Sequence, residues 1–121
     1  MVDDSPSQLC LVTALLDSLG YELATAADGE RAVAVAAEFA PDLVILDMKL
    51  PPWGGVEVAR RIKAEPRARG AAILAVSGYD FDEIRTVASA GVAAFLRKPI
   101  SGEALRLKVA ELLRRASLSA P

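Results

Sequence analysis

Apolar residues along this 121-residue chain follow two patterns that alternate from one end to the other. Short continuous apolar runs, such as LVIL at 43–46 and AAILAV at 71–76, are typical of strands buried on both faces of a sheet. Between these runs, apolar residues recur every three or four positions, as in helices with one buried face. The alternation predicts parallel βαβ units, and therefore an α/β fold with a doubly wound sheet and helices on both of its faces.

Caps and helix breakers set the boundaries of these elements. The SPSQ sequence at 5–8 forms a capping-box pattern at the start of the first helix, and Gly20 ends that helix. The chain is expected to be a single domain over residues 1–121, with a short tail at 117–121. Strands are predicted at 21–26, 43–46, 71–76 and 93–97, and further helices at 28–40, 56–64, 80–90 and 101–116.

The composition narrows the possible functions. A net charge of −2 offers no basic surface for nucleic acid, and no apolar run approaches the ~20 residues of a membrane span. The single cysteine, Cys10, cannot form an internal disulfide, so we expect a cytoplasmic protein in which this side chain is a small buried hydrophobe. The chain has no histidine, which excludes histidine acid–base catalysis, histidine metal ligands and a role as phosphohistidine donor.

Polar side chains follow the carboxyl ends of the predicted strands. In an open parallel sheet these ends lie along one edge, where such folds bind their ligands. Each residue alone is ordinarily a cap, a turn residue or a surface residue, but their joint placement after several strands favours a functional site. The residues in this position are Asp3, Asp4, Asp47, Ser77 and Lys98.

This set of residues indicates phosphoryl chemistry. Three carboxylates in one place repel one another unless a cation relieves the repulsion, and a set of hard oxygen ligands favours Mg²⁺. Lys98 adds a fixed positive charge and Ser77 adds a hydroxyl donor for phosphoryl oxygens. Carboxylates can also attack phosphorus and form aspartyl phosphates.

Four short motifs, together with Gly55, carry a resemblance to a known family. The motifs are VDDSP at 2–6, PDLVILDMKLP at 41–51, AVSG at 75–78 and FLRKP at 95–99. With these motifs at their spacing, the whole chain resembles a response-regulator receiver domain of two-component signalling. The resemblance implies a flavodoxin-like, five-stranded parallel sheet of order 2-1-3-4-5, here with a shortened first strand.

The resemblance also implies a role for each acid. Asp47 corresponds to the phosphoacceptor. Asp4 corresponds to the direct Mg²⁺ ligand, and Asp3 corresponds to a neighbour that acts mostly through metal-bound water. Lys49 stands where the backbone carbonyl contacts the metal, so its side chain is not needed for that contact.

Further matching residues correspond to the switch and to its modulators. Ser77 matches the hydroxyl position and Lys98 the lysine that pairs with phosphoryl oxygens. Phe95 takes the position of the switch aromatic, or is simply a core residue of its strand. Pro99 follows Lys98, as in the family, where this peptide bond is cis. Lys49, Tyr79 and Gly78 border the path to Asp47, and we expect Lys49 and Tyr79 to set the phosphoryl lifetime.

The function implied is that of a phosphoacceptor in a phosphorelay. A partner phosphohistidine, on a histidine kinase or a histidine phosphotransfer protein, would supply the phosphoryl group, and the domain would catalyse its own phosphorylation and dephosphorylation. The helix–strand–helix face at roughly 80–116 would then switch, and it is also a possible homodimer surface. No nucleic acid or membrane is expected as a direct partner.

Other interpretations stay open at this stage. A receiver-like interaction module that works without phosphate is the main alternative, although the intact acids argue against it. An aspartate-nucleophile phosphatase would need a second aspartate where Lys49 stands. A flavin-binding protein would need a phosphate-cradling loop in place of Asp3 and Asp4. Because so little precedes the acid pair, we also expect a truncated first strand; a short true start with a frayed strand is the alternative.

Overall fold

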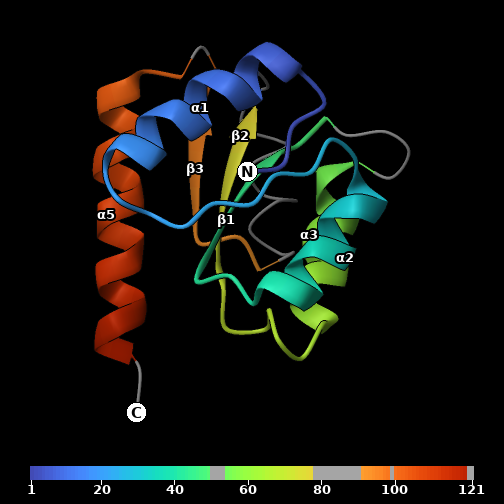
Figure 1. Ribbon diagram of the computed structural model, residues 1–121. Helices are drawn as coiled ribbons and strands as arrows, with labels where there is room; N and C mark the ends of the chain where they lie inside the picture. Colours follow the sequence, from blue (N-terminus) through green and yellow to red (C-terminus); the bar gives the residue numbers. More distant parts are fainter. Residues whose placement is uncertain (50–53, 78–90, 99, 120–121) are drawn as a thin grey trace.

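The described part of the chain forms three layers, with helices on both faces of a parallel sheet (Figure 1). The computed structural model describes residues 1–49, 54–77, 91–98 and 100–119, with side chains to residue 115. Helices α1 and α5 cover one face of the sheet, and α2 and α3 cover the other (Figure 1). The predicted α/β class is therefore confirmed. The helices are α1 (Pro6–Ser18), α2 (Gly29–Phe39), α3 (Gly55–Ala64) and α5 (Gly102–Ser119), and the strands are β1 (Leu43–Asp47), β2 (Ala72–Ser77) and β3 (Ala94–Arg97).

The three strands pair in parallel in the order β1-β2-β3. In this register Asp47 at the end of β1 lies beside Val76, and Ser77 at the end of β2 lies beside Arg97. The carboxyl ends of the strands therefore share one edge, as the sequence predicted. The helix expected at 80–90 lies outside the described residues.

Val2 extends the sheet beyond β1 by a single residue. It forms parallel bridges with Leu46 on one side and with Ala26 on the other, which places these segments in the expected sequence across the sheet. Within the described residues, however, the sheet has three strands and not the predicted five. The prediction of a strand at 21–26 is wrong, because Ala26 is the only residue of this segment that pairs. Its inner neighbour is the single residue Val2, and one residue gives the rest of the segment no ladder to join.

Local signals explain where the helices begin and end. The Ser5 hydroxyl accepts a hydrogen bond from the Gln8 N–H (3.3 Å), which caps α1 as predicted. Asp28 caps α2 in the same way, through the Arg31 N–H at 2.8 Å. Cys10, in contrast, is exposed rather than buried. It lies two positions from the buried Val12, and two positions correspond to about 200° around a helix, so it faces away from the core.

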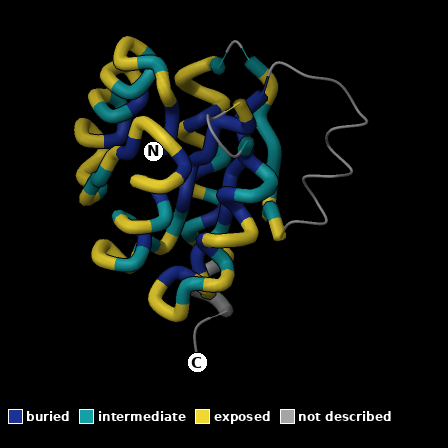
Figure 2. Tube along the Cα trace, turned by 90° about the vertical axis from the view of Figure 1, so that its right-hand side faces the viewer, coloured by how far each residue is buried: buried dark blue, intermediate teal, exposed yellow. Residues whose placement is uncertain are grey.

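The core lies on both faces of the sheet, in two clusters. Figure 2 shows the buried residues at the centre of the molecule, with exposed ones around them. Alternate residues of β1 point to opposite faces: Val44 and Leu46 join the cluster under α2 and α3, whereas Ile45 joins the cluster under α1 and α5. The prediction of strands buried on both faces is confirmed for β1 and β2. None of the helices in the described ranges is long and apolar enough to cross a membrane.

A cavity of about 440 Å³ opens beside the amino-terminal end of the Val2 segment. It lies between the 21–26 segment and the start of β1, and it reaches both core clusters. The Met1 amine is at its edge and donates a hydrogen bond to the Ala24 carbonyl at 3.0 Å. Burial lowers the pKa of this amine from 8.0 to about 6.

Candidate functional site

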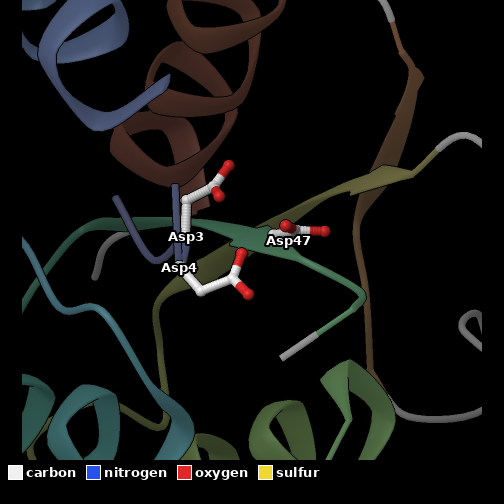
Figure 3. Close-up of side chains that lie close together, drawn as sticks. All are labelled: Asp3, Asp4 and Asp47. Atoms are coloured by element: carbon white, nitrogen blue, oxygen red, sulfur yellow. The ribbon is translucent and has the colours of Figure 1, made fainter. Parts of the chain in front are cut away.

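Three carboxylates meet at the carboxyl edge of the sheet. Asp3, Asp4 and Asp47 each offer an oxygen, and these oxygens lie within 4.8 Å of one another. Figure 3 shows Asp3 and Asp4 on the amino-terminal segment, beside Asp47 at the end of β1. Two backbone hydrogen bonds of Val2 set this approach: its N–H donates to the Ile45 carbonyl (2.7 Å), and its carbonyl accepts from the Asp47 N–H (2.9 Å).

Asp3 is the most deeply buried of the three acids, with no exposed surface. Its Oδ1 accepts a hydrogen bond from the Ser5 N–H at 2.9 Å, while Oδ2 is buried and accepts no hydrogen bond from the described residues. Burial raises the pKa of the Asp3 carboxyl; the Ser5 N–H opposes this rise, and the nearby charge of Asp47 adds to it. A bound cation would stabilise the negative charge of this buried oxygen, which no hydrogen-bond donor among the described residues does.

Lys98 supplies the positive charge of the site. Its Nζ lies 3.3 Å from Oδ2 of Asp47 and 3.9 Å from Oδ2 of Asp3. The backbone N–H of Lys98 donates to the Ser77 carbonyl at 2.9 Å, which fixes the start of the lysine side chain relative to β2. The ammonium therefore reaches across the sheet edge to both buried acids.

The Asp47 carboxylate is held at both of its oxygens. Oδ1 accepts a hydrogen bond from the Lys49 N–H at 3.0 Å, and Oδ2 accepts one from the Lys98 ammonium at 3.3 Å. Ser77, at the end of β2, is buried with 2% of its surface exposed. A carboxylate, an ammonium and a buried hydroxyl thus share this edge of the sheet.

Of the remaining predicted site residues, the structure describes Phe95 but not Gly78, Tyr79 or Pro99. Phe95 on β3 is half-buried and packs against the core cluster under α2 and α3. Gly78, Tyr79 and Pro99 lie outside the described residues. Ser5 was predicted only as a helix cap, yet its N–H also orients Asp3; its place two residues after an aspartate is a known signal for such a turn.

The donor set fits a hard divalent cation. The three side-chain ligands that the described residues bring together are carboxylates, as Mg²⁺ prefers. The buried Oδ2 of Asp3 also has no hydrogen-bond donor among these residues.

Comparison with known proteins decides the family. The family model of the response regulator receiver domain matches residues 1–110. The chain belongs to this family. The resemblance seen in the sequence is thereby confirmed, together with the role of a receiver domain in two-component signalling. Receiver domains are phosphorylated by histidine kinases in two-component systems.

Curated relatives share the receiver domain but are longer proteins. The chain is 31% identical over 121 residues to the alkaline phosphatase synthesis transcriptional regulatory protein PhoP of Bacillus subtilis. The alignment covers all of this chain and 50% of PhoP. It is 37% identical over 127 residues to the virulence sensor protein BvgS of Bordetella pertussis, of which it covers 10%. The receiver domain therefore spans half or less of these relatives.

Solved receiver structures confirm the fold. A CheY-like response regulator receiver domain protein from Methanospirillum hungatei has a TM-score of 0.92 at 26% identity, with 98% of this chain and 94% of that one covered. The receiver domain of the sensor histidine kinase PA1611 from Pseudomonas aeruginosa has a TM-score of 0.84 at 29% identity, with 93% of each chain covered. That structure holds a magnesium ion coordinated in its active site cleft.

Proposed function

We propose that this receiver domain accepts a phosphoryl group on Asp47 from a phosphohistidine of a partner kinase or phosphotransfer protein. The observation that carries the proposal is the Asp47 carboxylate, which is held by the Lys49 N–H and the Lys98 ammonium beside two further acids. In the reaction, an Asp47 oxygen forms a bond to phosphorus in line with the breaking bond between phosphorus and the partner's histidine nitrogen. The imidazole leaves as the acyl phosphate forms.

The neighbouring residues would stabilise the charge that develops. Lys98 is close enough to Asp47 to neutralise phosphoryl oxygens, and the Ser77 hydroxyl can donate a hydrogen bond to one of them. Asp3, Asp4 and Asp47, with the Lys49 carbonyl, would hold Mg²⁺. Bound Mg²⁺ would supply positive charge to the transferring group.

The switch would follow from the new phosphoryl oxygens. We propose that Ser77 moves toward them and that Phe95 turns to fill the space left behind. Phe95 has no hydroxyl, so packing alone would carry this step. Residues 80–90 of the proposed output and homodimer face, 80–116, lie outside the described part of the chain.

A direct test uses a small-molecule phosphodonor with Mg²⁺. Wild-type protein should gain the mass of one phosphoryl group, and chelation of the metal should abolish this gain. Asp47→Ala should gain none, while Asp17→Ala, on the exposed surface of α1, should behave as wild type. No gain by the wild type, either from this donor or from a phosphohistidine protein, would favour the interaction module that works without phosphate.

A further inference from the structure

Gly55, the first residue of α3, has no room for a side chain. A Cβ atom at this position would lie 2.5 Å from the Met48 Cα and 2.7 Å from both Sδ and Cε of Met48. The contact with Cα is the decisive one, because a backbone atom cannot turn aside as a side chain can. The preceding Gly54 meets a different need, since its φ of 78° lies in the region that favours glycine.

The close approach of Gly55 serves a hydrogen bond. The Gly55 N–H donates to the Met48 carbonyl at 2.9 Å. That carbonyl belongs to the same peptide group as the Lys49 N–H, which donates to Oδ1 of Asp47 at 3.0 Å. A peptide group is planar, so tilting its carbonyl tilts its N–H as well. One rigid unit therefore joins the start of α3 to the Asp47 carboxylate.

The backbone around Asp47 is already anchored to the sheet. The Asp47 N–H donates to the Val2 carbonyl at 2.9 Å, and the Met48 N–H donates to the Val76 carbonyl at 3.0 Å. These bonds fix the position of the chain but leave the direction of the Met48–Lys49 peptide group to its own partners. Among the described residues, the Gly55 N–H is a partner that holds its carbonyl.

We propose that Gly55 is a positioning residue for Asp47. Its missing side chain lets the start of α3 approach the Met48–Lys49 peptide group, and that group orients the carboxylate for attack. This inference rests on the proposed function of Asp47 as phosphoacceptor. Gly55 itself contacts no reacting atom, and it acts through the peptide group alone.

The test compares two glycine-to-alanine variants. Gly55→Ala should lower the phosphorylation rate at saturating phosphodonor about tenfold to a hundredfold, as expected when a reacting group is displaced by roughly an ångström. The donor concentration for half-maximal rate should change little, because donor binding is untouched. Gly70→Ala is the matched control, since a Cβ there meets no atom within 4 Å; its rate should equal that of the wild type. A Gly55→Ala rate equal to that of Gly70→Ala would overturn the proposal.

A double variant separates backbone positioning from side-chain packing. Adding Met48→Ala to Gly55→Ala removes the contacts with Sδ and Cε but keeps the contact with Cα. The proposal therefore predicts no recovery of the rate. Recovery to the wild-type rate would show that crowding of the Met48 side chain is the whole effect, and would overturn it.

Amide resonances test the same link without a substitution at Gly55, should that variant fail to fold. Asp47→Ala removes the acceptor of the Lys49 N–H, so the Lys49 and Gly55 amide resonances should both move relative to the wild type. The Leu105 amide on α5, bonded to the Ser101 carbonyl, serves as the reference. A Gly55 resonance that moves no more than that of Leu105 would contradict the proposal. The resonance experiment tests the connection between Gly55 and Asp47 even if the wild type is not phosphorylated. Absence of phosphorylation would overturn only the proposed function.

Discussion

The Lys98 ammonium lies 3.3 Å from Oδ2 of Asp47 and 3.9 Å from Oδ2 of Asp3, so one cation is shared by two buried acids. The Lys98 charge attracts both carboxylates and offsets part of the repulsion between them. The same charge repels any metal ion that enters the cluster. Lys98 therefore favours the phosphoryl group and competes with the cation.

Replacing this lysine should separate its two effects. Lys98→Met should strengthen Mg²⁺ binding by roughly twofold to fivefold, because an interaction between partly exposed charges changes a binding constant by about that factor. The same substitution should slow phosphorylation. Isothermal titration calorimetry measures the first effect and a phosphodonor assay the second. Lys108→Met, which removes a lysine paired with Glu111 on α5, is the matched control and should change neither. Weaker Mg²⁺ binding by Lys98→Met would contradict this account.

Asp3 should make the stability of the metal-free protein depend on pH. Burial raises its pKa above the usual 3.8, so the folded chain keeps this proton to a higher pH than the unfolded chain does. The contribution of Asp3 to the free energy of unfolding is complete below pH 3.8 and is lost as pH rises through the folded-state pKa.

Denaturant unfolding at several pH values measures this dependence. Asp3→Asn should remove that part of the dependence and bind Mg²⁺ more weakly, whereas the exposed Asp17→Asn should do neither. A wild-type pH profile that is unchanged in Asp3→Asn would contradict the expected role of burial.

Lys49 and Tyr79 should set the lifetime of the aspartyl phosphate. Both stand two residues after a site residue, Asp47 and Ser77 respectively, and long or bulky side chains there would obstruct the hydrolytic water. Lys49→Ala and Tyr79→Ala should therefore speed loss of the phosphoryl group, followed by mass spectrometry over time. Rates within about twofold of the wild type, a barrier change of less than ~0.5 kcal/mol, would show that the two side chains have no such role.

The cavity beside Val2 predicts a gain in stability from a designed extension. Three apolar residues such as Val-Ile-Val, fused ahead of Met1, would continue the ladder and contact both core clusters. Since ~1 kcal/mol corresponds to 4–8 °C in a small domain, the melting temperature should rise by about 4 °C or more. A Gly-Ser-Asp extension of the same length is the control. Equal melting temperatures for the two fusions would show that the cavity does not accept the strand.

The sequence was most informative where a short-range pattern sets the structure. Asp47 and Ser77 end apolar runs, so the rule that parallel strands share one carboxyl edge was enough to bring them together. The 21–26 segment has strand-like residues but forms only one bridge, because pairing depends on a neighbour that local pattern does not reveal. The need for glycine at 55 was also hidden, since it comes from the Met48 Cα, which is not a neighbour in the sequence.

The central claim is that the Asp47 carboxylate becomes an acyl phosphate. Incubation with a phosphohistidine protein and Mg²⁺, followed by borohydride reduction, should convert the modified aspartate to homoserine, which peptide mass spectrometry locates. The account predicts homoserine at position 47, and none when Mg²⁺ is chelated. Homoserine at Asp3 or Asp4 instead, or a chain that gains a phosphoryl group and yields no homoserine at 47, would contradict it.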